Sequence, residues 1–236
     1  MGARGGPNIV LDKLVFCVDA SNTNSYVSSS LDVFNLQDRN IKGNIENGLS
    51  FSSDKLGAWD FDGADDNINL GSIDSSNVLS LYNTPFTIST WLAADLTGDI
   101  YQRVMDKSDT SGGATGYAFI FPNGTTAQAS LYCGPAGNVA IAYTIPGYTA
   151  GQWVNISITK TGDDHQIYIN GALVKSQTTS DRDVASDTTN ARIGTWNHST
   201  AREYNGKIAS ILIYHKVLSA EEIQQNYNTL KSRFIW

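Results

Sequence analysis

Three carboxylates lie within one short segment, at Asp62, Asp65 and Asp66, and Asn67 follows them. Carboxylate and amide oxygens are the hard ligands that Ca²⁺ takes in sets of about six to eight. The segment is therefore a candidate site for a structural calcium ion. The same residue types are typical of a tight turn, because Asp and Asn side chains accept hydrogen bonds from nearby backbone amides. Calcium and a turn remain alternatives, and a turn explains the carboxylates better than catalysis does.

A second group of residues could bind a sugar, because it combines aromatic rings with polar side chains. The segment from Thr195 to Thr200 reads as an exposed loop, so Trp196 is expected at the surface. The alternative for any tyrosine or tryptophan is a place in the core, which we prefer for Trp91 and Trp153. The candidate sugar contacts are Trp196, His198, Tyr101 and Arg202.

No catalytic pattern accompanies these residues. His165, His198 and His215 have no nucleophile motif near them. His165 precedes a hairpin strand and is expected at the surface. Gly112-Gly113 lacks the lysine and the following helix of a phosphate-binding loop. We therefore predict that the protein is not an enzyme and requires no cofactor.

Composition indicates one globular domain and excludes several partners. The chain has 236 residues, of which 41% are hydrophobic and 17% charged, and its formal net charge is -7. An acidic protein repels phosphate backbones, so we expect no nucleic acid partner. No run approaches the roughly 18 apolar residues of a membrane helix, so membrane insertion is not expected either. The start lacks the apolar stretch of a signal peptide, which fits synthesis in a cytoplasm or a chain that begins after a removed signal.

Short alternating runs bounded by Gly, Asn, Asp and Ser predict an all-β protein. Both faces of 86–92 can pack, so this strand is expected at the centre of a sheet. Asn170-Gly171 separates two apolar runs and predicts a hairpin with a type I′ turn. Cys17 and Cys133 lie far apart in strand-like runs, and two buried thiols are preferred to a disulfide.

One helix is predicted, at the end of the chain. Ser219 and Glu222 form a capping box, which satisfies the first free amides of a helix over 220–232. Ile223, Tyr227 and Leu230 share one face of that helix and should dock on the sandwich. Residues 1–13 are predicted to form a flexible N-terminal arm, and residues 14–236 to form the β-sandwich domain, the helix included.

Several motifs in this order resemble the concanavalin A-like lectin/glucanase superfamily, specifically its laminin-G-like jelly rolls. The resemblance implies a two-sheet antiparallel sandwich over nearly the whole chain. The motifs are Phe61-Asp-Gly-Ala-Asp-Asp66, Phe86-Thr-Ile-Ser-Thr-Trp91, Trp153, Tyr168-Ile-Asn-Gly171, and Gly206-Lys-Ile208 running to Leu218-Ser-Ala-Glu-Glu-Ile223.

Two departures from that family bear on chemistry. Its glucanases carry catalytic carboxylates at alternate positions of one strand, and no such strand exists in this sequence. Relatives that bind calcium commonly carry an acidic residue in the closing strand, where this chain has Ala209 and Ser210. The first departure argues against an enzyme, and the second weakens the calcium interpretation.

A narrower resemblance lies at the start of the chain. Gly6-Pro-Asn-Ile-Val10 and Leu14-Val-Phe-Cys-Val-Asp-Ala-Ser-Asn22 are similar to the openings of laminin-G-like proteins of tailed bacteriophages, often virion structural proteins. The resemblance implies a non-enzymatic virion component, such as a capsid decoration, head-fibre or tail-appendage subunit. It implies other virion proteins as partners, a homo-oligomer, and cell-surface polysaccharide as a further partner.

The alternative hypothesis is a carbohydrate-binding, lectin-like module of a cell-surface or secreted bacterial protein. The two hypotheses overlap, because a virion surface protein can hold a particle near a polysaccharide. They place the protein in a virion assembled in a host cytoplasm, or outside or on the surface of a cell.

Overall fold

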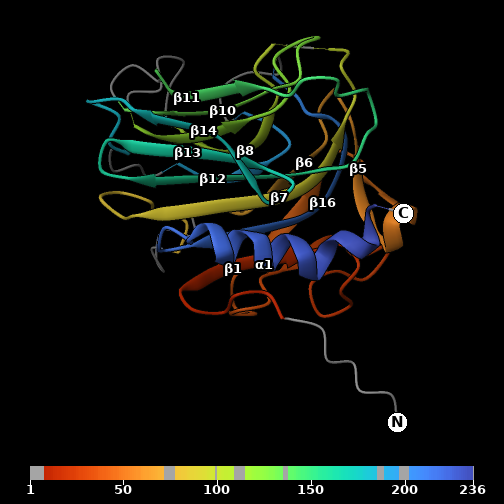
Figure 1. Ribbon diagram of the computed structural model, residues 1–236. Helices are drawn as coiled ribbons and strands as arrows, with labels where there is room; N and C mark the ends of the chain where they lie inside the picture. Colours follow the sequence, from red (N-terminus) through yellow and green to blue (C-terminus); the bar gives the residue numbers. More distant parts are fainter. Residues whose placement is uncertain are drawn as a thin grey trace.

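Two antiparallel sheets make up the protein in the computed structural model, which describes residues 8–71, 78–98, 100–108, 115–134, 138–184, 189–196 and 202–235 (Figure 1). The first sheet has the strand order β14 (Ala172–Thr178), β13 (Asp164–Ile169), β12 (Val154–Thr161), β7 (Phe86–Ala94), β16 (Asn205–Tyr214), β5 (Ala58–Asp62), β4 (Ser50–Ser52), and β1 (Leu14–Asp19) also pairs with β16. The second sheet has the order β11 (Val139–Thr144), β10 (Gln128–Cys133), β9 (Gly116–Ile120), β8 (Arg103–Ser108), β15 (Arg192–Ile193), β6 (Asn67–Asn69), β3 (Lys42–Glu46), β2 (Asp32–Phe34). The predicted all-β jelly-roll sandwich is confirmed.

One large hydrophobic core fills the space between the sheets. The first sheet contributes Ile88, Ile156 and Ile208, and the second contributes Met105 and Phe119, all fully buried. Strand β7 is central as predicted, because it pairs with β12 on one side and β16 on the other. Burying each such side chain contributes about 1.5–3 kcal/mol, so this core provides the main stabilisation of the fold.

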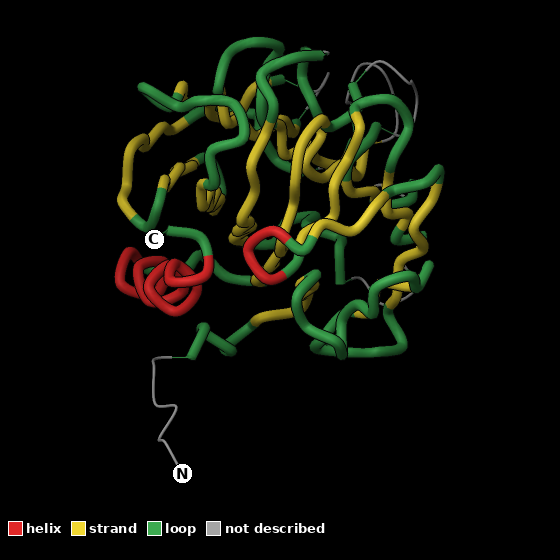
Figure 2. Tube along the Cα trace, turned by 90° about the vertical axis from the view of Figure 1, so that its right-hand side faces the viewer, coloured by secondary structure: helices red, strands yellow, loops and turns green. Residues whose placement is uncertain are grey.

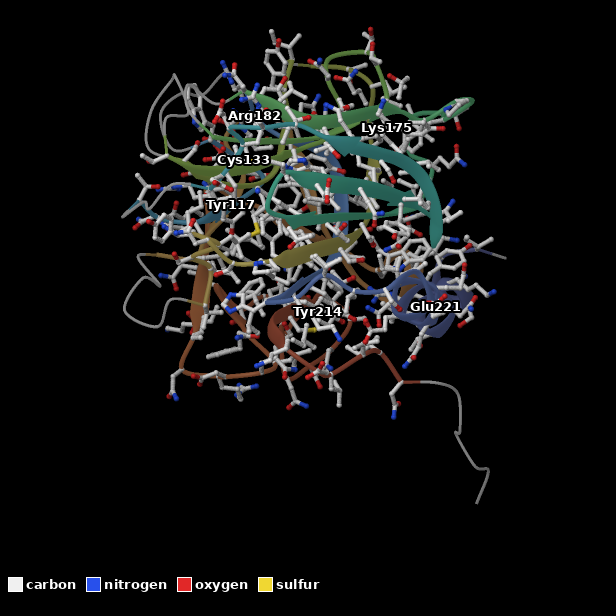
Figure 3. All side chains as sticks on the ribbon, turned by 60° about the vertical axis from the view of Figure 1, so that its left-hand side comes forward. Tyr117, Cys133, Lys175, Arg182, Tyr214 and Glu221 are labelled. Carbon is white, nitrogen blue, oxygen red and sulfur yellow. The ribbon has the colours of Figure 1, made fainter. Side chains whose placement is uncertain are left out.

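The hairpin between β13 and β14 forms as its sequence predicts. Asn170 has φ of 52° and Gly171 has φ of 81°, the two positive angles of a type I′ turn. Cys17 and Cys133 are both buried free thiols, and burial raises the pKa of each to about 12. Figure 3 labels Cys133 and the core residue Tyr117 among the strands of the sandwich.

Helix α1 (Ala220–Leu230) lies along the outer face of the first sheet (Figures 1 and 2). Its predicted capping box is present, with Ser219 and Glu222 each accepting from the other's backbone amide. Ile223 packs in a buried cluster with Leu212 and Tyr214 of β16. The helix ends at Leu230, and a short 3-10 helix, η4 (Lys231–Arg233), follows it. No helix among the described residues is long and apolar enough to cross a membrane.

The end of the chain also packs on the first sheet. The Phe234 ring stacks on the Trp91 ring of β7, with centroids 4.1 Å apart and an interplanar angle of 12°. Tyr227 of α1 stacks on the same indole at 5.7 Å. Trp91 is fully buried under these rings, so helix and C-terminal segment together cover the outer face of this sheet at β7 and β16.

The last residues of the predicted arm are hydrogen-bonded to the domain. The Val10 backbone amide donates to Asn226 Oδ1 at 2.8 Å, and the Tyr214 hydroxyl donates to the Val10 carbonyl at 3.0 Å. Gln225 Nε2 donates to the carbonyl of Asn8 at 2.7 Å. Side chains of α1 and β16 anchor this segment. Local sequence patterns do not predict such contacts, because the partners lie more than 200 positions apart. Residues 1–7 of the predicted arm lie outside the described residues.

The prediction that His165 lies at the surface is wrong, because its side chain is 1% exposed. His165 lies on β13 opposite Lys160 of β12 and Gln177 of β14, inside the sheet. Burial lowers the pKa of this imidazole, and the charge of Lys160 lowers it further.

We therefore predict a stability loss in mild acid that His165 helps to cause. The unfolded imidazole has a pKa of about 6.5, above that of the folded state, so the unfolded chain binds more protons as the pH falls below that value. The free energy of unfolding should therefore decrease as the pH falls through this window. The melting temperature of His165→Gln, measured between pH 7.5 and 5, should fall less than that of the wild type. His215 carries a lowered pKa for the same reason, so part of the dependence should remain. Identical pH profiles for the two proteins would contradict the role of His165.

Candidate functional site

The two faces of the second sheet differ sharply in chemistry. Residues paired directly across antiparallel strands point to the same face, so the register defines rows across the sheet. The row that faces the core is apolar throughout: Ile45, Ile68, Ile193, Met105, Phe119, Leu131, Ile141. The neighbouring row faces the other way and is mostly polar. We call it the polar strip: Asp32, Asn44, Asn69, Arg192, Asp106, Ala118, Tyr132.

Around Arg192 the strip is a closed ionic network. Its guanidinium donates to Glu46 Oε2 at 2.9 Å and to Asn67 Oδ1 at 2.8 Å. Asn69 Nδ2 donates to the second oxygen of Glu46 at 2.9 Å. The positive and negative charges are matched one to one here, so this part of the strip is electrically balanced.

Towards β10 the strip meets a group that we call the aromatic–arginine cluster: Tyr101, Arg103, Tyr132, Trp196, Arg202. The Arg202 guanidinium carbon lies 4.3 Å from the centroid of the Trp196 indole and 5.3 Å from that of the Tyr101 ring. The Tyr101 and Tyr132 rings meet edge to face at 5.8 Å. The Arg103 guanidinium carbon lies 5.7 Å from the centroid of the Trp196 ring. The cluster thus offers ring faces, hydroxyls and guanidinium donors together.

Backbone hydrogen bonds attach the segment that carries Trp196 and Arg202 to the start of β8. The Arg103 amide donates to the Arg202 carbonyl at 3.1 Å, and the Gly194 amide to the Val104 carbonyl at 3.4 Å. Gly194 begins this segment with φ of +90°, and a Cβ there would lie 2.2 Å from the Phe61 ring. Only glycine fits this approach, so the core residue Phe61 fixes where the segment leaves the sheet.

Tyr101 adopts a backbone conformation that is rare for its residue type. Its φ is 61°, in the left-handed region, and its amide donates to Asn123 Oδ1 at 3.2 Å. A non-glycine residue in this region costs on the order of 1–3 kcal/mol, and such residues concentrate at functional sites. In this conformation the Tyr101 ring lies beside Tyr132 and Arg202.

Two perturbed pKa values describe the electrostatics of the cluster. Burial lowers the pKa of Arg103, Asp106 opposes that effect, and the charge of Arg202 adds to it. Arg103 Nε lies 3.0 Å from Asp106 Oδ2, and both side chains are almost completely buried. Burial also raises the pKa of the Tyr132 hydroxyl, as does its neighbour Tyr101.

Of the four predicted sugar contacts, the structure brings Tyr101, Trp196 and Arg202 together, and His198 lies outside the described residues. The prediction that Trp196 is exposed is wrong, because it is 7% exposed. The guanidinium of Arg202 covers its ring. Sequence reasoning did not single out Arg103 and Asp106, because residues three apart in a regular strand point to opposite faces. An irregular register between Arg103 and Met105 brings the two side chains to the same face.

The carboxylates of the outer face are engaged in ion pairs. Asp106 pairs with Arg103, and Glu46 pairs with Arg192. A glycosidase needs one carboxyl group free to act as an acid and a second free to act as a nucleophile or base. Asp106 and Glu46 are therefore held by neighbouring guanidiniums, and neither is free in this sense.

The carboxylates of Asp62, Asp65 and Asp66 form a separate group at the turn between β5 and β6. One oxygen of each lies within 4.8 Å of the others. Asp62 Oδ1 accepts from the Ala64 amide at 2.8 Å, and Asp66 Oδ2 accepts from the Asp62 amide at 3.1 Å. Burial raises the pKa of Asp66 to about 6, and the charges of Asp62 and Asp65 also raise it. These contacts are those of the predicted turn, and the oxygens left over could face a cation.

Solved structures share this fold at low sequence identity. The binding domain of Paraclostridial Mosquitocidal Protein 1 has a TM-score of 0.67 and 16% identity over 92% of this chain and 52% of its own. Domain 4 of AbnA, an extracellular arabinanase from Geobacillus stearothermophilus in complex with arabinotriose, has a TM-score of 0.62 and 16% identity over 91% of this chain and 98% of its own. Trypanosoma rangeli sialidase in complex with sialic acid has a TM-score of 0.71 and 12% identity over 100% of this chain and 36% of its own. This chain thus spans about half of the first structure and about a third of the third.

Sequence comparison gives the family. No curated protein matches the sequence. The family model Laminin_G_3 matches residues 62–224, which is well over half of the chain and includes both the acidic turn and the aromatic–arginine cluster. The protein belongs to the concanavalin A-like lectin/glucanases superfamily.

Proposed function

We propose that the protein is a glycan-binding module and that the aromatic–arginine cluster contacts the sugar. One observation carries the proposal: Tyr101, Tyr132 and Arg202 meet at one end of a polar strip that crosses the second sheet. Sugar rings have apolar faces, which pack on aromatic rings, and hydroxyls, which hydrogen-bond to polar side chains. Sites that recognise small molecules combine the two in this way.

The ligands bound by other proteins of this fold support the proposal. The arabinanase domain was solved with arabinotriose, and the binding domain of Botulinum neurotoxin DC, 13% identical with a TM-score of 0.65, was solved in complex with SialylT. The same neurotoxin domain was also solved with rat synaptotagmin II, a protein. A surface of this chain that binds glycans without turnover is consistent with the ion-paired carboxylates of the second sheet.

The first test is a glycan array with wild type, Tyr101→Ala and Tyr132→Ala. Each variant removes a ring of the cluster, and loss of about 1 kcal/mol of aromatic contact weakens binding about fivefold. Affinities for the glycans that bind should then be measured by titration calorimetry. Trp196→Ala is a poor choice, because it empties a buried position.

Tyr82→Ala is the matched control, since Tyr82 is an exposed tyrosine that is 50% accessible and lies outside the cluster. Its binding should equal that of the wild type. Unchanged binding by both cluster variants would exclude the cluster as the site. Absence of binding to every glycan would contradict the proposed function.

We further propose that the module acts on the surface of a virion, with other virion proteins as neighbours and a homo-oligomeric state. This placement is supported by the sequence of residues 6–26, which resembles the openings of tailed-phage proteins. The alternative is a cell-surface or extracellular protein with the same glycan-binding role. Mass spectrometry of purified particles should find the protein in stoichiometric amounts, and its absence from them would leave the alternative.

We propose a structural calcium ion at Asp62, Asp65 and Asp66. Calcium should relieve the repulsion between these carboxylates, so it should raise the melting temperature of protein first treated with a chelator. A ligand at about 100 times its Kd stabilises by about 2.7 kcal/mol. Calorimetric titration should give heat with the wild type and none with Asp66→Asn. Asp38→Asn is the control, because Asp38 also accepts a backbone amide of its turn, from Asn40 at 3.0 Å. A wild type without heat or melting shift would show that these residues form a turn alone.

A further inference from the structure

We propose that the aromatic–arginine cluster selects acidic sugars and that Arg202 binds the carboxylate of a uronic or sialic acid residue. This inference rests on the proposed function and names its ligand class. The cluster contains two guanidinium groups, those of Arg103 and Arg202, and one ion pair, between Arg103 and Asp106. Arg192 on the same face differs from Arg202, because it forms an ion pair with Glu46.

Among the described residues, two aromatic rings position the Arg202 side chain. Its guanidinium lies over Trp196 at 4.3 Å and over Tyr101 at 5.3 Å. Its side chain is half-buried, and within the described part of the chain it forms no ion pair and donates no hydrogen bond. Stacking holds the plane of a guanidinium while leaving its edge free, and that edge matches a carboxylate in a bidentate pair. The N–H groups of Arg202 can therefore donate hydrogen bonds to a bound anion.

Arg103 adds a second positive charge beneath this position. It is 4% exposed, and its Nη1 atom is buried without a hydrogen-bond acceptor among the described residues. Two neighbouring guanidiniums repel each other, and the charge of Arg202 accordingly contributes to the lowered pKa of Arg103. A carboxylate bound at Arg202 would relieve that repulsion. In a buried environment such charge interactions are screened less than at the surface.

The surroundings favour a sugar acid over a free inorganic anion. The chain as a whole carries a net charge of -7, so it repels anions except where positive charge is concentrated. Tyr101 and Tyr132 lie at the edge of the same cluster and offer a ring face and a hydroxyl within reach of the Arg202 side chain. A pyranose with a carboxylate satisfies both requirements, because its ring can pack on an aromatic face while its acid group meets the guanidinium.

Calorimetric titration with matched ligands tests the inference. The first pair is trigalacturonic acid and its methyl ester, which differ in charge but share the ring, and the second is sialyllactose and lactose. An acid of at least one pair should bind about tenfold or more tighter than its neutral partner, as a charge-assisted hydrogen bond would give. Higher salt should weaken the binding of the acidic ligand and leave the affinity for the neutral ligand unchanged. The pair that shows the preference identifies the source of the carboxylate.

Arg202→Met should remove the preference and leave the affinity for the neutral ligand near that of the wild type. Arg202→Lys keeps the charge but not the planar fork, so it should retain part of the preference. Arg39→Met is the matched control, because Arg39 also stacks on a ring, that of Phe34, at 4.4 Å, but lies by β2 at the opposite edge of the sheet.

The outcomes separate this inference from the proposed function. Equal binding of acid and neutral ligands, or a preference that survives in Arg202→Met, would overturn the inference while the glycan-binding function stands. A preference lost equally in Arg39→Met would trace it to overall charge and also overturn the inference. Failure of all four ligands and of the glycan array would contradict both.

Discussion

The register of the short strand β15 is the constraint on which the surface of the second sheet depends. Arg192 and Ile193 pair with β6 on one side and β8 on the other, and no other strand joins these two halves of the sheet among the described residues. Because side chains alternate with a period of two, a slip of one residue would turn Arg192 into the core and Ile193 outward. Burying an unpaired guanidinium costs far more than this strand could recover. The apolar row on the inside therefore fixes the polar strip on the outside.

Local patterns predicted the parts of the fold that depend on neighbours in sequence. The Asn170-Gly171 turn needs two positive φ angles, and the capping box at Ser219 needs only a residue three positions later. The aromatic–arginine cluster could be predicted only in part, because its members come from segments near residues 101, 132 and 202 that meet through sheet pairing. Trp196 looked exposed because the residues after it are polar, whereas its ring is covered by Arg202 from the far end of the same loop. His165 looked exposed because it comes just before the apolar run of a hairpin strand, and the neighbours that bury it come from β12 and β14.

The buried pair of Arg103 and Asp106 is difficult to explain by stability. Removing two charges from water costs several kcal/mol for each ion, and well-packed apolar residues of similar size often serve the fold as well or better. Ala118 and Ile120 of the adjacent strand β9 show that this face tolerates apolar side chains. The strained φ of Tyr101 is a second cost at the same place. Two unfavourable features that converge on one cluster are expected where a site is organised for a ligand, and not where packing alone decides.

The outer faces of the two sheets differ in what covers them. On the first sheet, α1 and the ring of Phe234 cover Trp91 and Tyr214, so the chain itself covers that face at β7 and β16. The segment at Asn8 is hydrogen-bonded to α1 through Gln225, which brings both described ends of the chain to this side. The polar strip lies on the outer face of the opposite sheet. Helix α1 and the aromatic–arginine cluster therefore lie on opposite outer faces of the sandwich, so a contact made through the helix does not bury the cluster.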